Sequence, residues 1–299
     1  MKRFALLSVL LVIAISASGL AQIAVKITVT HANGKVTPYT GTAATVGDAC
    51  GAAFRDATEN HQGTTNLLAG DVIQIPEVVA CNIRGNPSES GMVWPSDLKI
   101  VGKGPKSTTL NSADDFSLSG NGQVFQDLTL DFDNTCCKDS ALINVSPTTG
   151  IFTLKNVNMI TRKGCNGPGG VSVESGNALL DHVNLTSATL SIYSGSGGKI
   201  TIRNSTVSAF CDNAVGGTGT VDMYDSQISN TKDNDDSTLY PMGGTLNIYA
   251  GTSIVAASGS RSIACNGDTV TVNLYPGSHL SGTIDNKGGC KVNNIPPPK

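Results

Sequence analysis

Apolar residues recur along the chain as short couplets, in which two apolar side chains flank one residue of the opposite face. Nine couplets follow one another at intervals of 21 to 29 residues, and only Gln123 breaks their apolar pattern. Two-residue alternation predicts a strand with one buried face. A repeat of this length predicts a solenoid, because each unit can bury its apolar face only against its neighbours. The couplets are Ile73/Ile75, Leu98/Ile100, Gln123/Phe125, Phe152/Leu154, Ala178/Leu180, Ile200/Ile202, Val221/Met223, Leu246/Ile248 and Val272/Leu274.

The residues before the first couplet, 22–70, predict an N-terminal cap. Alternating apolar residues over 25–29 predict a strand, and Asn33-Gly34 predicts the tight turn of a hairpin after it. Residues 50–59 are the best helix candidate. A helix here would close the open end of the solenoid, where unpaired strand edges would otherwise favour aggregation.

The first residues are typical of a secretory signal. Lys2 and Arg3 precede an apolar run over 4–15, and small residues at 19–21 suit cleavage. We therefore expect residues 1–21 to be removed and the protein to be secreted into the periplasm or the extracellular space. One β-helix domain, 22–292, then remains, and the proline-rich residues 293–299 are expected to form a tail that cannot pair as a strand.

Composition narrows the choice of partners. Loss of Lys2 and Arg3 with the signal changes the formal net charge from −3 to −5, and only 14% of all residues are charged. A nucleic acid or an anionic membrane surface is a poor partner for such a chain. No later apolar run approaches the roughly 20 residues of a membrane span, so no span is expected in the mature chain.

The chain resembles a known group of exported β-helix proteins. Residues Cys50–Ala57 are similar to their CSLREA-type N-terminal motif, in which an amphipathic helix caps the first coil, and keep Cys50, Arg55 and Ala57. Residues 98–110 resemble the early coils of pectate-lyase-like proteins. The resemblance covers roughly 46–290. It implies an all-β, single-stranded, right-handed parallel β-helix with a short capping helix, and the nine couplets predict about nine coils. It implies no single activity, because this fold serves lyases, hydrolases, adhesins and inert shafts.

Eight cysteines in an exported chain predict a disulfide framework. Cys265 and Cys290 lie 17 and 16 residues after their couplets, and are therefore one coil apart. Adjacent coils lie about 4.8 Å apart, which is within reach of a disulfide. Cys50 and Cys81 flank the first coil and form a second candidate pair.

The other four cysteines allow more than one arrangement. Cys136 and Cys165 each lie 11 residues after a couplet, so Cys136, or its neighbour Cys137, is expected to pair with Cys165. This leaves Cys137 and Cys211, several coils apart, and pairing within the set could change to include Cys165 with Cys211.

The residues that directly follow the couplets point outward and form a column. This column is charged in the middle coils and aromatic in the later ones. Opposite charges alternate at Lys155, Asp181 and Arg203, and then three tyrosines follow: Tyr224, Tyr249 and Tyr275. One interpretation is a saccharide-binding surface, with the tyrosines as contacts and Arg203 fixing the orientation of the ligand. The alternative is that stacked aromatics and ion pairs stabilise the solenoid, at about 0.2–1 kcal/mol per pair.

A second column, two residues after each couplet, includes His182. The Asp181-His182 sequence is superficially similar to an Asp-His pair of pectate lyases. Neighbouring coils, however, place Asn or Asp at this position, the residue types that accept tight-turn backbone geometry. The turn interpretation explains His182 without catalysis. The column reads Asp127, Asn156, His182, Asn204 and Asp225.

Two acidic clusters raise the question of Ca²⁺. Pectate lyases of this fold use acidic groups to hold Ca²⁺ against an acidic sugar and a basic group to remove a proton. Asp131, Asp133, Arg162 and Lys163 could furnish those parts, although an ordinary surface ion pair between Asp133 and Arg162 also explains them.

The run 233–236 is the densest acidic stretch, and Asp233, Asp235 and Asp236 are weak Ca²⁺ candidates. The glycine turn and the distal Glu of a complete Ca²⁺ loop are missing. We expect no resident cofactor, with Ca²⁺ as the one candidate ion.

The sequence therefore leaves three functions open. The first is an exported β-helix protein that binds a polysaccharide or a cell-surface glycan, as an adhesin-type module does. The second is a polysaccharide lyase acting on an acidic glycan. The third is a purely structural extracellular shaft. Binding without catalysis is the preferred hypothesis, and Tyr224, Tyr249 and Tyr275 are the first choice for the contact surface.

Overall fold

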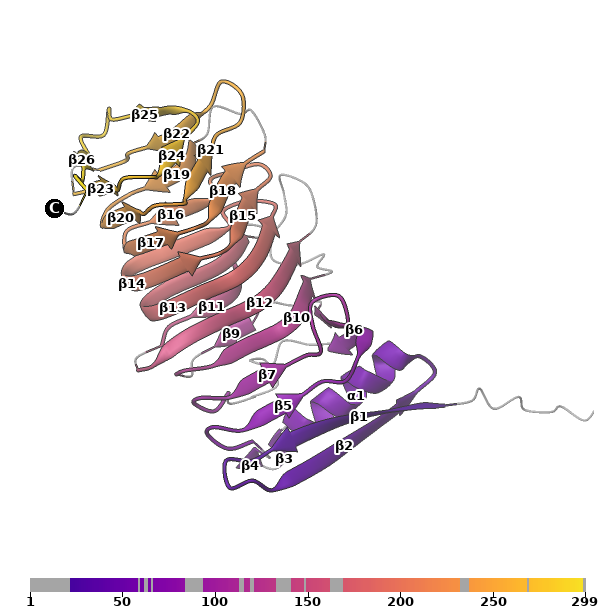
Figure 1. The fold of residues 1–299 in the computed structure, drawn as a ribbon. Coiled ribbons are helices and arrows are strands. Elements are labelled where there is room, and N and C mark those ends of the chain that lie inside the picture. The colour runs from indigo at the N-terminus through magenta and orange to yellow at the C-terminus, as the bar shows by residue number, and fades with distance from the viewer. Residues whose placement is uncertain are drawn as a thin grey trace, which may run out of the picture.

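The chain folds as a parallel β-solenoid of about seven turns with one short N-terminal helix (Figure 1). This architecture comes from a computed structural model. The residues that the structure describes are 22–58, 60–61, 64–65, 67–83, 94–112, 116–118, 121–132, 141–147, 149–161, 169–231, 237–267 and 269–297.

The nine couplets form one column of parallel strands, which we call the first sheet. Phe125 pairs with Ile100 below it and Leu154 above it, as the predicted register requires. Gln123, the exception in the pattern, is buried, and its Nε2 donates to the carbonyl oxygen of Pro95 at 3.2 Å. In whole or in part, the first sheet contains β5 (Val72–Gln74), β7 (Lys99–Val101), β10 (Val124–Phe132), β12 (Ile151–Thr161), β13 (Gly169–Ser187), β14 (Ile192–Arg203), β17 (Thr220–Tyr224), β20 (Thr245–Ile248), β23 (Thr271–Leu274) and β26 (Lys291–Asn294).

Two further sheets complete each turn and enclose a narrow core of aliphatic and Phe side chains. The second sheet contains β6 (Val78–Ile83), β8 (Thr108–Ser112), the later parts of β10, β12 and β13, and then β15 (Thr206–Ala209), β18 (Gln227–Asn230), β21 (Ser253–Val255) and β24 (His279–Leu280). The third sheet contains β9 (Phe116–Leu118), β11 (Ala141–Val145), the first parts of β13 and β14, and then β16 (Val215–Gly217), β19 (Ser237–Pro241), β22 (Arg261–Ala264) and β25 (Thr283–Asp285).

The solenoid has about seven turns, fewer than the nine coils predicted. The couplets count strands of the first sheet, whereas a full turn needs a strand on every face. The first coil, β5 and β6, has no strand of the third sheet among the described residues. The last coil ends in β24 and β25, which are only 2 and 3 residues long.

The N-terminal end is closed by a hairpin and a helix, as predicted (Figure 1). Strands β1 (Ile23–Thr30) and β2 (Val36–Ala43) pair antiparallel, and β1 also pairs antiparallel with β5. Helix α1 (Val46–Thr58) begins four residues earlier than the predicted start at 50. The reason is an N-cap: the Thr45 hydroxyl accepts a hydrogen bond from the Asp48 backbone N–H at 3.1 Å. Short strands β3 (Asn60–His61) and β4 (Thr64–Thr65) form a separate antiparallel pair.

The C-terminal end continues the first sheet slightly further than expected. Asn293 and Asn294 belong to β26 and pair with Asn273 and Leu274, although residues 293–299 were expected to form an unpaired tail. The Ile295 N–H still donates to the carbonyl oxygen of Leu274. The next residue is proline, which has no N–H to donate, so the ladder ends there.

Two predicted disulfides are confirmed, Cys50–Cys81 and Cys265–Cys290. Cys211 is also disulfide-bonded. Cys136, Cys137 and Cys165, with which it forms the predicted set, lie outside the described residues. Disulfides are typical of proteins in oxidising compartments outside the cytosol. No helix in the described part of the chain is long and apolar enough to cross a membrane. The expected signal, residues 1–21, also lies outside the described residues.

Candidate functional site

The outer face of the first sheet repeats one row of side chains on three successive strands. Each row contains a Thr, an Asp or Asn and a Tyr, separated by the two buried residues of the couplet. These rows are Thr220/Asp222/Tyr224 on β17, Thr245/Asn247/Tyr249 along β20 and Thr271/Asn273/Tyr275 along β23. Because the strands are in register, the rows form three parallel columns, which we call the Thr, amide and Tyr columns.

The Tyr column is a continuous stack. The ring centroids of Tyr224 and Tyr249 are 4.0 Å apart at an interplanar angle of 9°, and those of Tyr249 and Tyr275 are 4.2 Å apart at 19°. Both broad faces of the Tyr249 ring are therefore covered by its neighbours. A sugar cannot stack on that ring face, and the groups left to meet a ligand are the ring edges and the hydroxyls.

The hydroxyls of the three tyrosines lie beside one another along the stack. The neighbouring Tyr224 hydroxyl and partial burial raise the pKa of Tyr249, against a smaller opposing effect of the Tyr275 hydroxyl. The Tyr249 hydroxyl likewise raises the pKa of Tyr275. Both hydroxyls are therefore held in the neutral form more strongly than that of a free tyrosine.

The amide column is a second ladder beside the first. Each amide Nδ2 donates to the side-chain oxygen on the preceding coil. The distances are 2.6 Å from Asn247 to Asp222, 2.7 Å from Asn273 to Asn247 and 2.8 Å from Asn293 to Asn273. At its lower end, Asp222 also forms an ion pair with Lys199 at 3.1 Å. The second hydrogen of each amide group is not used in this ladder and can donate to a ligand.

The preceding coils carry charge where the later ones carry tyrosine. Arg203 donates to Asp181 at 2.8 Å, and His182 and Asn204 also contact this carboxylate. Burial alone would raise the pKa of Asp181, but these three hydrogen bonds outweigh it and lower the pKa to about 2. Arg203 is in register with Tyr224, so the charged and aromatic parts of the column meet.

A shallow hollow lies on the same face, beside the charged residues. Its volume is about 330 Å³. Ile151, which is 50% exposed, contributes an apolar surface, and Lys199 links the hollow to Asp222. The hollow is lined by Ile151, Asn177, Ala178, Leu179, Lys199 and Thr201.

His182 is a turn residue, as its column predicts. It has a positive φ of 55°, and every other member of the column has a positive φ as well. The left-handed conformation favours Asn and Asp among non-glycine residues. The Asp181–His182 hydrogen bond does exist, at 2.8 Å. It belongs to the turn and to the ion pair beside it, and the His182 side chain is 62% exposed.

The predicted lyase residues are only partly described. Asp131 lies on β10, half-buried and in register with Ile160, as predicted. Asp133, Arg162 and Lys163 lie outside the described residues, and so do the Ca²⁺ candidates Asp233, Asp235 and Asp236. Among the residues that the structure describes, no group of three or more His, Cys, Asp or Glu could hold a metal ion.

The sequence analysis found the Tyr column but assigned no role to the two columns beside it. The signal was present as the pattern Thr-apolar-Asp/Asn-apolar-Tyr, which occurs at 220–224, 245–249 and 271–275. Comparison with known proteins adds no further guidance, since no protein-family model, curated protein or solved structure matches the chain.

Proposed function

We propose that this protein is exported through its N-terminal signal and binds an extended polysaccharide along the outer face of its first sheet. The single observation that supports this is the threefold repetition of the Thr, amide and phenol row in register on β17, β20 and β23. A repeating array of donors and acceptors suits a repeating polymer better than a single small molecule. Hydrogen-bonding groups beside an apolar surface are typical of small-molecule and sugar sites.

The polysaccharide best suited to this face is neutral or weakly charged. The charged groups next to the Tyr column are already paired, Arg203 with Asp181 and Lys199 with Asp222. The ligand would contact the edge of the Tyr column through hydroxyl groups, since both ring faces of Tyr249 are covered. The hollow beside Lys199 would receive an apolar face of a sugar ring against Ile151 and Leu179.

The test is affinity electrophoresis or a glycan array with mature protein and two variants. Tyr249→Phe keeps the stacked ring and removes the hydroxyl, and Leu179→Arg places a long side chain across the hollow. Tyr249→Phe should weaken binding about twofold to tenfold, as expected for one hydrogen bond of about 0.5–1.5 kcal/mol. Leu179→Arg should also weaken binding, because its side chain blocks the hollow. Tyr193→Phe, on the third sheet, is the matched control and should bind as the parent does.

A second candidate function is a structural extracellular shaft. The observation that favours it is the same stack, because ring faces and amides that bind one another strengthen the solenoid without any ligand. If the parent protein binds none of the polysaccharides tested, the structural shaft is favoured. Release of an unsaturated product from an acidic glycan, followed by absorbance, would instead favour a lyase.

A further inference from the structure

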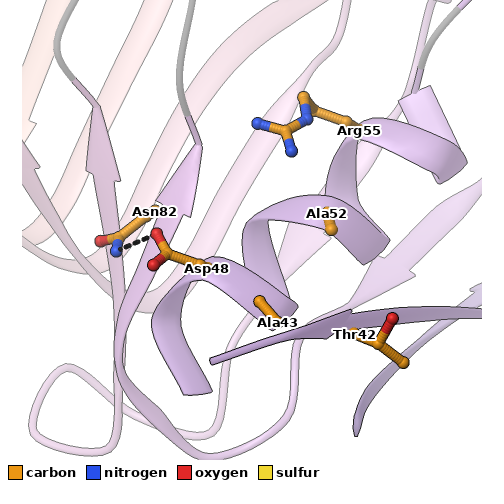
Figure 2. Close-up of a pocket in the computed structure, with 6 residues that line it drawn as sticks. All are labelled: Thr42, Ala43, Asp48, Ala52, Arg55 and Asn82. Atoms are coloured by element: carbon orange, nitrogen blue, oxygen red, sulfur yellow. Dashed lines mark hydrogen bonds between the residues drawn. The ribbon is translucent and has the colours of Figure 1, made fainter. Parts of the chain in front are cut away.

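A second pocket lies at the N-terminal cap, at the other end of the solenoid from the Tyr column (Figure 1). It has a volume of about 200 Å³. Strand β2, helix α1 and strand β6 form its walls, as Figure 2 shows. The residues that line it are Thr42, Ala43, Asp48, Ala52, Arg55 and Asn82.

Three of these residues form one stripe along α1. Asp48, Ala52 and Arg55 occupy positions i, i+4 and i+7, which lie on the same face of a helix. Seven residues correspond to about 10 Å along the helix axis. Asp48 and Arg55 are therefore two helical turns apart in the backbone, and the small Ala52 side chain between them leaves that part of the pocket open (Figure 2).

The Asp48 carboxylate is held in place. Its Oδ1 accepts a hydrogen bond from Asn82 Nδ2 at 2.9 Å, and its Oδ2 accepts one from the Thr45 hydroxyl at 2.9 Å. Asn82 Oδ1 in turn accepts a bond from Asn111 on the next coil at 3.4 Å. The carboxylate is half-buried and cannot turn away from the pocket without breaking these contacts.

The Arg55 guanidinium has the opposite character. Within the described ranges it forms no hydrogen bond or ion pair, and it lies beyond 4.0 Å from Asp48, the limit for an ion pair. Figure 2 shows it extending over the side of α1 on which Asp48 and Asn82 lie. A half-buried guanidinium with free donors is suited to bind a carboxylate through two parallel hydrogen bonds.

We propose that this cap pocket binds a small zwitterion, with the ligand carboxylate on Arg55 and the ligand ammonium on Asp48. The ligand class is a chain with a terminal amine and a carboxylate several bonds apart, as in ω-amino acids. A ligand with one charge would contact only one of the two charged residues of the pocket. The site is independent of the polysaccharide-binding face and stands whether or not that proposal holds.

The first experiment measures binding of a length series to mature protein by calorimetry or ligand-observed NMR. The probes are glycine, 4-aminobutyrate and 6-aminohexanoate, with hexanoate and hexylamine as singly charged controls. Affinity should rise with chain length, and 6-aminohexanoate should bind at least tenfold more tightly than either control. No detectable binding of any ω-amino acid, or equal binding of hexanoate, overturns the proposal.

Two variants then locate the site. Arg55→Gln removes the carboxylate partner and should abolish binding of 6-aminohexanoate. Ala52→Leu keeps both charges and the N-cap at Thr45 but fills the middle of the pocket, and should weaken binding at least tenfold. Asp56→Asn, on the exposed side of the same helix, is the control and should bind as the parent does. Retained affinity in Ala52→Leu at unchanged melting temperature rejects this pocket as the site.

Discussion

The charged and aromatic parts of one column on the first sheet occupy equivalent positions of the repeat but are stabilised in different ways. On β13 and β14, Asp181 is buried beneath Arg203, and three hydrogen bonds hold its charge. Along β20 and β23, Tyr249 and Tyr275 are neutral and stack at 4.2 Å. The backbone spacing is the same in both parts. At this repeat position, the fold therefore accepts any side chain that interacts favourably with the equivalent side chains on the coils above and below.

The two solutions differ in what they leave for a ligand. The ion pair neutralises both of its charges, so the charged part offers few free groups beyond the hollow beside Lys199. The Tyr column uses its ring faces internally but keeps a row of hydroxyls at the surface, next to the amide column. Under the proposed function, stability and binding depend on different atoms of the same tyrosines, and substitutions can separate them.

The largest expected effect comes from breaking the aromatic stack at its centre. Tyr249→Ser removes two stacking contacts, each worth about 0.5–1.5 kcal/mol, so the free energy of unfolding should fall by about 1–3 kcal/mol. Tyr249→Phe keeps both contacts and should stay within about 1 kcal/mol of the parent, since it loses only the hydroxyl group. Urea unfolding followed by circular dichroism measures both. Equal stability of the Ser variant and the parent would show that the stack adds nothing to the solenoid.

A smaller effect is expected from acid, and only in the charged part. The pKa of Asp181 is about 2 in the folded protein and 3.8 in a free side chain. A lowered pKa stabilises the fold above the unfolded value, and this contribution is lost as pH falls from about 4 towards 2. Arg203 is 49% exposed, so solvent screening leaves about 1 kcal/mol rather than the full value of the shift.

The measurement is the melting temperature of parent and Asp181→Asn between pH 2 and pH 6. The difference between the two proteins should be greatest near pH 6 and should become much smaller as pH approaches 2. Taking this difference also cancels the effect of Asp285, whose pKa is lowered by the hydrogen bond from Arg261. A constant difference across the range would mean that the carboxylate does not stabilise the fold through its charge.

The Tyr column should respond at the other end of the pH scale. The pKa values of Tyr249 and Tyr275 are raised above 10.0, so their contribution is complete below that pH and is lost as pH rises through the folded-state values. An absorbance titration of phenolate should show fewer tyrosines ionised near pH 10 in folded protein than in urea. Tyr249→Phe should reduce this difference in the number of ionised tyrosines between folded protein and urea. An unchanged difference would mean that other tyrosines cause it.

Most of the fold could be predicted because it depends on strict alternation. The couplets, their register, the hairpin at Asn33-Gly34 and two disulfides all follow from which face a residue occupies and from the distance between coils. The start of α1 was missed because Thr45 and Asp48 cap a helix whose first turn contains Gly47, a weak helix former. The number of closed turns was overestimated because short end strands cannot be judged from couplets alone.

The candidate site was predictable only in outline. Alternation indicated that Tyr224, Tyr249 and Tyr275 point outward, but not that their ring faces would cover one another, since that depends on side-chain rotamers. The cap pocket illustrates a different limit. The stripe of Asp48, Ala52 and Arg55 is visible in the sequence, yet the space above it exists only because β2 and β6 pack on either side of the helix.

The smallest expected effect lies at Asp222, where the charged and amide parts of the face meet. Its Oδ2 contacts Lys199 at 3.1 Å, and its Oδ1 accepts the first amide of the ladder from Asn247 at 2.6 Å. Asp222→Asn keeps an oxygen for Asn247 and loses only the ion pair to Lys199, whose side chain is 53% exposed. The loss in unfolding free energy should therefore stay below about 1 kcal/mol. Raising NaCl from 0.05 M to 1 M, roughly 14 Å to 3 Å in Debye length, should weaken the parent and leave the variant nearly unchanged. A loss much larger than 1 kcal/mol that salt does not reduce would mean that the ladder needs the charge of Asp222, and that the two parts of the face form one coupled unit.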